Sequence, residues 1–248
     1  ASNKPFKEAG LKKSIGVNYK LLGRYYMIGN NFQDALESFN LAEKLFIEAN
    51  DSCELFYIYN NFIDYHIKTG NIRKAEQYAN ISLKFLNDTS NLQKISLLYN
   101  NLGEIELKRR NLENAKANFF KTLQLGNNYT SSVLRRINTY FQLSEISKVE
   151  NNKTLARKYA DSARLLLPSS GYYRLKYKIY SQLSDVYKDE PIAVPFLKIA
   201  TQYLDSANMS LTKTTKSFYN AKNEQEKTET ELKNLIYEST PKSESRQF

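Results

Sequence analysis

The sequence predicts an all-α solenoid, a stack of helix pairs, from three observations that share one spacing. Five tyrosines recur at intervals of 40 or 41 residues: Tyr19, Tyr59, Tyr99, Tyr140 and Tyr180. A large apolar side chain follows three residues after each tyrosine, and the next residue is Gly or Ser in four of the five cases. Self-similarity at a period of about 20–50 residues is typical of repeats that bury their apolar faces against one another.

The first helix of each repeat surrounds its tyrosine. The apolar residues three positions later are Leu22, Phe62, Leu102, Leu143 and Leu183. The small residues that follow are Gly23, Gly103, Ser144 and Ser184, and Ile63 is the exception. A small side chain at this point lets the second helix approach the first closely, while the bulky residues fill the space around the contact.

The second helix of each repeat begins before a regularly placed alanine. Sixteen residues after the first four tyrosines are Ala35, Ala75, Ala115 and Ala156. Four and seven residues further on are Phe39, Ala79, Phe119 and Ala160, then Ala42, Ser82, Thr122 and Ala163. This spacing of three and four places one apolar stripe on each helix. The predicted turns between the helices are Gly29–Asn31, Gly70–Asn71, Arg110–Asn111 and Asn151–Asn152.

The fifth repeat departs from the pattern. Phe196 stands where alanine is expected, and Pro191 and Pro195 crowd the start of the second helix. Proline is tolerated only in the first turn of a helix. We therefore expect this helix to begin late.

These positions resemble the tetratricopeptide repeat (TPR), whose best copy here is Tyr19, Leu22, Gly23, Tyr26, Ala35, Phe39 and Ala42. The resemblance is strong from residue 16 to about 168 and continues to about 208. It implies a right-handed α-α solenoid of about five helix pairs plus a C-terminal helix. The expected repeats lie near 16–49, 56–89, 96–129, 137–170 and 177–208. The period of about 40 residues resembles the longer repeats of kinesin light chain.

The remaining chain differs from the repeats. Residues 209–238 read as a polar C-terminal capping or signalling helix, and residues 239–248 as a flexible tail. Its apolar residues form only a weak heptad, so we expect capping of the last repeat up to about Tyr219 and a projecting, partly frayed helix beyond. Dimerisation through this helix is the alternative. Repeats followed by a Lys- and Glu-rich helix resemble the sensory part of bacterial membrane-bound regulators.

Composition restricts the function classes. The net charge is +10, but the 36 basic residues are scattered among 26 acidic ones, which favours a generic basic surface over a nucleic-acid interface. Cys53 is the only cysteine, so no internal disulfide and no cysteine metal cluster are expected. No apolar run is long enough for a membrane span. We expect no cofactor and no metal.

Enzymatic motifs are missing from the sequence. It has no P-loop, no HExxH and no dinucleotide-binding fingerprint. The single histidine, His66, occupies the repeat position of Tyr26 and Tyr187, which indicates a packed core imidazole. No nucleophile accompanies it. The sequence therefore predicts a protein that is not an enzyme.

The TPR resemblance places a partner-binding groove on the concave face, along the first helices. The residues one and five positions beyond the tyrosines would line it: Lys20, Arg24, Asn60, Asp64, Asn100, Glu104, Phe141, Glu145 and Asp185. The companion position in the fifth repeat is Ser181. Asn can bond the backbone of an extended peptide through both its C=O and its NH2. The alternative is a solvated helix face, because Asp64–Lys68 and Glu104–Lys108 are also ordinary i,i+4 pairs.

The sequence as a whole predicts a non-catalytic module that binds a protein or an extended peptide. The favoured version is the sensor or scaffold part of a bacterial signalling protein, which would be extracytoplasmic. The alternatives are a free-standing cytoplasmic scaffold and, more distantly, an enzyme or a nucleic-acid binder.

Overall fold

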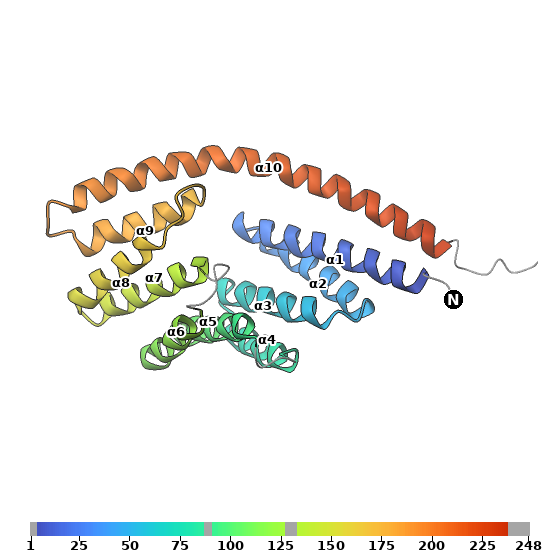
Figure 1. Cartoon of the computed structure of the whole chain (residues 1–248), viewed down its shortest axis with the longest axis horizontal. Helices are drawn as coiled ribbons and strands as arrows, with labels where there is room; N and C mark the ends of the chain where they lie inside the picture. The colour runs from blue at the N-terminus through green and yellow to red at the C-terminus, as the bar shows by residue number, and fades with distance from the viewer. Residues whose placement is uncertain (1–3, 87–90, 127–132, 238–248) are drawn as a thin grey trace, which may run out of the picture. The chain divides into compact units, whose positions relative to one another are not determined.

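The computed structural model describes residues 4–86, 91–126 and 133–237, without the side chains of residues 4–6, 211–219, 221, 225 and 235–237. Within these ranges the chain forms ten α-helices and no β-strand (Figure 1). They are α1 (Lys4–Ile28), α2 (Phe32–Glu48), α3 (Ser52–Lys68), α4 (Ile72–Lys84), α5 (Leu92–Lys108), α6 (Leu112–Gly126), α7 (Val133–Val149), α8 (Lys153–Leu165), α9 (Tyr173–Val186) and α10 (Ala193–Tyr237). The paired helices confirm the predicted all-α solenoid.

The chain divides into two compact units. Unit 1 consists of residues 1–65 with 215–248, and unit 2 of residues 66–214. In unit 2, consecutive helices from α4 to α9 pack on one another, and the first helices of neighbouring repeats also touch, α5 against α7 and α7 against α9. We call the surface formed by α5, α7 and α9 the first-helix face of unit 2.

The turns inside the first four repeats follow one design. The second residue after each first helix has a positive φ, and these residues are Asn30, Gly70, Arg110 and Asn151. The next residue is always Asn. In repeat four, Asn152 N donates to Ser147 O at 2.8 Å, and Asn152 Oδ1 accepts from Leu155 N at 3.0 Å. In repeats two to four one asparagine thus closes the first helix and caps the second, whereas Asn31 in repeat one makes no side-chain cap. The turns lie where the sequence predicted them.

Small residues set the contact between the two helices of a repeat. A Cβ added to Gly103 would lie 2.6 Å from Cε1 of Phe119, so only glycine accommodates this ring. In repeat four the facing residue is the small Ala160, and Ser144 replaces glycine. There Ser144 Oγ donates to Ala156 O at 2.8 Å across the same seam. The close approach predicted from the sequence is confirmed, with the hydroxyl group satisfied by a backbone carbonyl.

Helix α10 differs from the expected arrangement. It begins at Ala193 with Pro195 in its first turn, late in the fifth repeat, as predicted. It then runs for 45 residues to Tyr237, so the second helix of the fifth repeat and the expected separate C-terminal helix are one continuous helix. The physical reason lies in the sequence, because residues 196–237 contain neither glycine nor proline to interrupt helical hydrogen bonding.

The expectation that the chain beyond Tyr219 projects into solvent is wrong. In unit 1, Tyr19 Oη on α1 donates to Glu229 Oε1 on α10 at 2.6 Å, and the Leu232 side chain is 9% exposed. This part of α10 is therefore held by a hydrogen bond to Tyr19, and its Leu232 is buried. The expected capping contacts of Leu211, Phe218 and Tyr219 lie outside the described side chains, and Met209 is exposed.

Candidate peptide-binding face

The two units each hold part of the predicted groove. Unit 1 contains Lys20, Arg24, Asn60 and Asp64, and unit 2 contains Asn100, Glu104, Phe141, Glu145 and Asp185. In unit 2 all five lie on α5, α7 or α9, the helices of the first-helix face. The structure links most of these five through hydrogen bonds and one half-buried cation, so the candidate site is built from unit 2.

Of the four predicted groove residues in unit 1, Lys20 and Asn60 form contacts within that unit. Lys20 on α1 forms an ion pair with Glu54 on α3, and its Nζ lies 5.8 Å from the ring centre of Phe46. Asn60 is buried, and its Nδ2 donates to Phe56 O at 2.7 Å within α3. Asp64 is half-buried and Arg24 is exposed. The amide donor of Asn60 that the sequence assigned to a peptide thus has an internal acceptor.

Asn100 on α5, like Asn60, is buried and forms hydrogen bonds within the protein. Its side chain is only 7% exposed. Nδ2 donates to Glu104 Oε1 at 3.0 Å, and Oδ1 accepts from Thr139 Oγ1 on α7 at 3.2 Å. The amide therefore holds α5 against α7 and fixes the carboxylate of Glu104. Because both ends of the amide already have partners, Asn100 orders the first-helix face from within.

Gln182 on α9 provides the corresponding link to α7. Its Nε2 donates to Phe141 O at 3.0 Å and to Glu145 Oε1 at 2.7 Å. Its Oε1 is buried and accepts no hydrogen bond from any described residue. A buried acceptor without a donor costs about 1–3 kcal/mol, so this oxygen is a place where a ligand N–H would be favoured.

Lys178 lies one helical turn before Gln182. Its Nζ is 3.7 Å from the ring centre of Phe141, and the side chain is half-buried. Among the described residues it makes no hydrogen bond or ion pair. Burial lowers the pKa of the Lys178 ammonium, although the carboxylates of Glu104 and Glu145 act in the opposite direction. The first-helix face thus carries a partly desolvated cation stacked on an aromatic ring.

The acidic end of the face is neutralised by Lys148 on α7. Its Nζ lies 3.0 Å from Glu145 Oε1 and 2.5 Å from Asp185 Oδ2 on α9. Burial acts to lower the pKa of Lys148, but the hydrogen bonds to Asp185 and Glu145 outweigh it and raise that pKa above its usual range. Two of the predicted groove acids are therefore joined by one lysine, as in the alternative of an ion-paired helix surface.

Sequence reasoning missed Thr139, Lys148, Lys178 and Gln182. A signal for the last was present, because the position two residues after the repeat tyrosine carries an amide in four repeats: Asn61, Asn101, Gln142 and Gln182. An amide at a recurring position can bond the backbone of the neighbouring helix, as Gln182 does. The other three follow no recurring pattern.

Several basic side chains elsewhere form ion pairs that bridge successive repeats. Such pairs join residues 33–37 positions apart, and they include Arg109–Glu76, Lys116–Glu150, Lys153–Asp189 and Arg157–Glu190. Each exposed pair contributes about 0–1 kcal/mol. The cations of these four pairs already face carboxylates.

The described residues contain no group of three or more His, Cys, Asp or Glu side chains placed to hold a metal ion. Across the described helices, none combines the length and apolar character that crossing a membrane requires. Unit 2 also has a pocket of about 260 Å³ beside the Lys148–Asp185 pair, lined by Lys153 and Asp189 among others. Its charged groups form ion pairs with each other, which leaves little driving force for a charged ligand.

His66 is a core residue, as the sequence indicated. It is buried, and its ring stacks on Tyr78 with centres 5.3 Å apart and planes 15° apart. Burial, and then the charge of Lys74, lower the pKa of His66. The neutral imidazole thus serves as an aromatic packing group.

This packing predicts a pH-dependent stability. The unfolded chain takes up the His66 proton at a higher pH than the folded chain, so stability is full above about pH 6.5 and falls as the pH decreases toward the folded pKa. His66→Tyr, which copies the residue of repeats one and five, should remove this part of the pH dependence. Urea unfolding of both proteins at pH 7.5 and pH 5.5 measures it. Equal losses in the two proteins would contradict the assignment.

No family model matches the sequence, and no curated protein matches it either. The structure resembles BtubC (BKLC) from P. vanneervenii with a TM-score of 0.56 and 19% identity, over 86% of this chain and 84% of that one. MamA gives a TM-score of 0.44 and 15% identity over 75% and 96% of the two chains. The pilF protein of Pseudomonas aeruginosa gives 0.43 and 18% over 82% and 99%. The likeness to BtubC, at a TM-score of 0.56 and over most of both chains, supports the predicted fold, and the chain has the architecture of a TPR-like solenoid.

Proposed function

We propose that this chain is a non-catalytic module that binds an extended peptide segment of a partner protein on the first-helix face of unit 2. The observation that carries the proposal is Lys178, a half-buried cation on Phe141 that makes no described ion pair. Keeping an ammonium group partly desolvated costs stability, and a carboxylate on a ligand would recover that cost.

The neighbouring groups favour a peptide over a small anion. Gln182 Oε1 is an acceptor without a described donor; because it is buried, a backbone N–H would reach it only after a movement of the Gln182 side chain, and Phe141 offers an aromatic surface nearby. An acceptor, an aromatic ring and a cation on adjacent helices match the alternating donors and side chains of an extended chain. Asn100 and Glu104 support the same surface from below, through their bonds to α7.

The biological setting that we propose is the sensor or scaffold part of a bacterial signalling or regulatory protein. Its support is α10, an uninterrupted helix of 45 residues that follows directly on the repeats and could transmit a binding event along its axis. A free-standing cytoplasmic scaffold that assembles a protein complex is the alternative. The gene sequence on both sides of the chain tests this choice, because a membrane span with an output domain would support the signalling protein.

The binding proposal predicts that one substitution lowers the affinity for a peptide without lowering the stability of the chain. Lys178→Met keeps the length of the side chain and its contact with Phe141 but removes the charge. We expect the affinity for a bound acidic peptide to fall by about 1–3 kcal/mol, while the free energy of unfolding is not lower than that of the wild type. Peptides selected from a random display library on the wild-type chain supply the ligand, and calorimetry measures the affinity.

Lys198→Met is the matched control, since Lys198 is an exposed lysine on α10. It should leave peptide binding unchanged. A library that enriches the same peptides on the wild type and on the Lys178→Met variant would place the binding surface elsewhere. Loss of both binding and folding in Lys178→Met would show that the lysine is structural.

A further inference from the structure

The side of a first helix that faces the preceding repeat has a recognisable set of contacts. In repeat two, the Phe62 ring on α3 lies 5.7 Å from the Phe39 ring on α2. The Tyr59 hydroxyl group forms a hydrogen bond with the carboxylate of Glu43, also on α2. The residues at the same positions in repeat one are Leu22 and Tyr19, forty residues earlier. They mark the edge of α1 on which a preceding repeat would stack.

In repeat one this edge is occupied by α10. Tyr19 Oη donates to Glu229 Oε1 at 2.6 Å. Glu229 therefore accepts the hydrogen bond of Tyr19 in the same way that Glu43 accepts that of Tyr59. Leu232, one turn further along α10, is 9% exposed in unit 1. A tyrosine–glutamate hydrogen bond thus recurs at the same register position, here on a helix that also carries a buried leucine, although this glutamate lies 210 residues from its tyrosine in the sequence.

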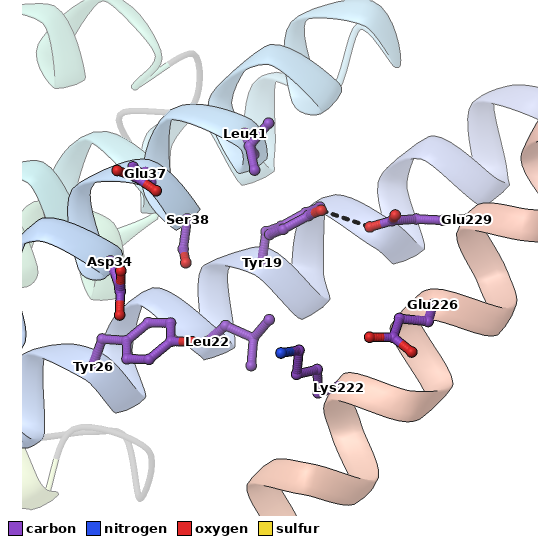
Figure 2. Close-up of a pocket in the computed structure, with 10 residues that line it drawn as sticks. All are labelled: Tyr19, Leu22, Tyr26, Asp34, Glu37, Ser38, Leu41, Lys222, Glu226 and Glu229. Atoms are coloured by element: carbon purple, nitrogen blue, oxygen red, sulfur yellow. Dashed lines mark hydrogen bonds between the residues drawn. The ribbon is translucent and has the colours of Figure 1, made fainter.

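The packing at this edge is incomplete. Figure 2 shows Lys222, Glu226 and Glu229 on one side of α10, turned toward α1 and α2. A pocket of about 290 Å³ remains there, lined also by Tyr19, Leu22, Tyr26, Asp34, Glu37, Ser38 and Leu41. By contrast, the ring of Phe39 inside the repeat is almost fully buried. Four carboxylates and one lysine share the pocket wall, so like charges oppose the contact.

We propose that residues 222–232 of α10 form a releasable cap of their own chain on the first repeat, in the register of a preceding repeat's second helix. The cap is held by the Tyr19–Glu229 hydrogen bond and by Leu232, and it is weakened by the acidic pocket. When it detaches, it exposes the Tyr19–Leu22–Tyr26 edge of α1. The cap is therefore a conformational device that controls access to the end of the solenoid.

Hydrogen exchange measured by mass spectrometry on the full chain tests this proposal. Tyr19→Phe and Glu229→Gln should each make amides of residues 16–28 exchange roughly tenfold faster, because Phe removes the hydrogen bond and Gln leaves a neutral acceptor in place of the charged one. The double variant should be no faster than either single variant, since both remove one interaction. Leu232→Ser should produce the same change.

Two further variants separate release of the cap from general damage. Glu226→Lys should slow exchange in residues 16–28, because it replaces a carboxylate in the acidic pocket by a cation. Glu231→Gln, at an exposed position on the same helix, is the control and should change nothing. Unchanged exchange in Glu229→Gln and Leu232→Ser, or additive effects in the double variant, would overturn the cap. So would a dimer in sedimentation experiments whose protection of α1 falls on dilution, because α10 would then come from a second copy.

Discussion

Phe119→Ala is expected to lower the free energy of unfolding by about 3–5 kcal/mol. The ring is fully buried in a cluster with Ala115 on α6 and with Leu143 and Ile146 on α7. Its loss removes contacts inside repeat three and between repeats three and four at once. The cavity cannot close easily, because Gly103 and Ala115 offer no side chain that could move into it. Urea denaturation followed by circular dichroism measures the change.

Phe120→Ala is the matched control for this substitution. Phe120 is the next residue of the same helix and is 47% exposed, so its removal should cost far less. Hydrogen exchange should locate the loss of protection from Phe119→Ala in α5, α6 and α7. Similar losses in the Phe119 and Phe120 variants would mean that the buried face of α6 is assigned incorrectly.

Gly103→Ile is expected to be the second most damaging change, with a cost of about 1–3 kcal/mol. Even the Cβ of the new side chain would lie 2.6 Å from Cε1 of Phe119, so the ring or the helix must move. At the same two positions repeat two carries Ile63 and Ala79, both fully or almost fully buried. Repeat two thus has its large residue on the first helix and its small residue on the second, whereas repeat three has the reverse.

This exchange predicts a rescue. Gly103→Ile combined with Phe119→Ala should be clearly less destabilised than the sum of the single variants, because the new isoleucine fills part of the space that the ring leaves. Thermal and urea unfolding of the four proteins complete a double-mutant cycle. Strict additivity would show that the two positions do not share one contact.

The first-helix face of unit 2 differs from the contacts inside each repeat in how far its polar groups are satisfied. Asn100 and Gln182 use their amides to join α5, α7 and α9, whereas Lys178 is left partly desolvated without a described partner. Interior polar groups such as the Asn100 amide and the Ser144 hydroxyl group have hydrogen-bond partners within unit 2. Residues that keep an unmet requirement, such as the Gln182 oxygen and the Lys178 ammonium group, are the ones that can gain from a ligand.

The sequence by itself determined the repeat register, the helix pairs and the turns. These depend on residues within one repeat: in most repeats a glycine or serine that permits close approach, an alanine sixteen residues after each of the first four tyrosines, and an asparagine in the turn before the second helix. Interactions over such short separations leave a periodic trace in the sequence. The late start of α10 was predictable for the same reason, because Pro195 can occupy only a first helical turn.

Only the tertiary structure decided which side chains meet across repeats. Thr139 reaches Asn100, and Gln182 reaches the Phe141 carbonyl group, over separations of 39 and 41 residues. The partner of Tyr19 is Glu229, which no local pattern could have indicated. The continuity of α10 follows from an absence of helix breakers, but its docking on α1 depends on how the whole chain is arranged. Periodicity specifies the helices and their order, whereas contacts between residues far apart in the sequence depend on packing that no single repeat encodes.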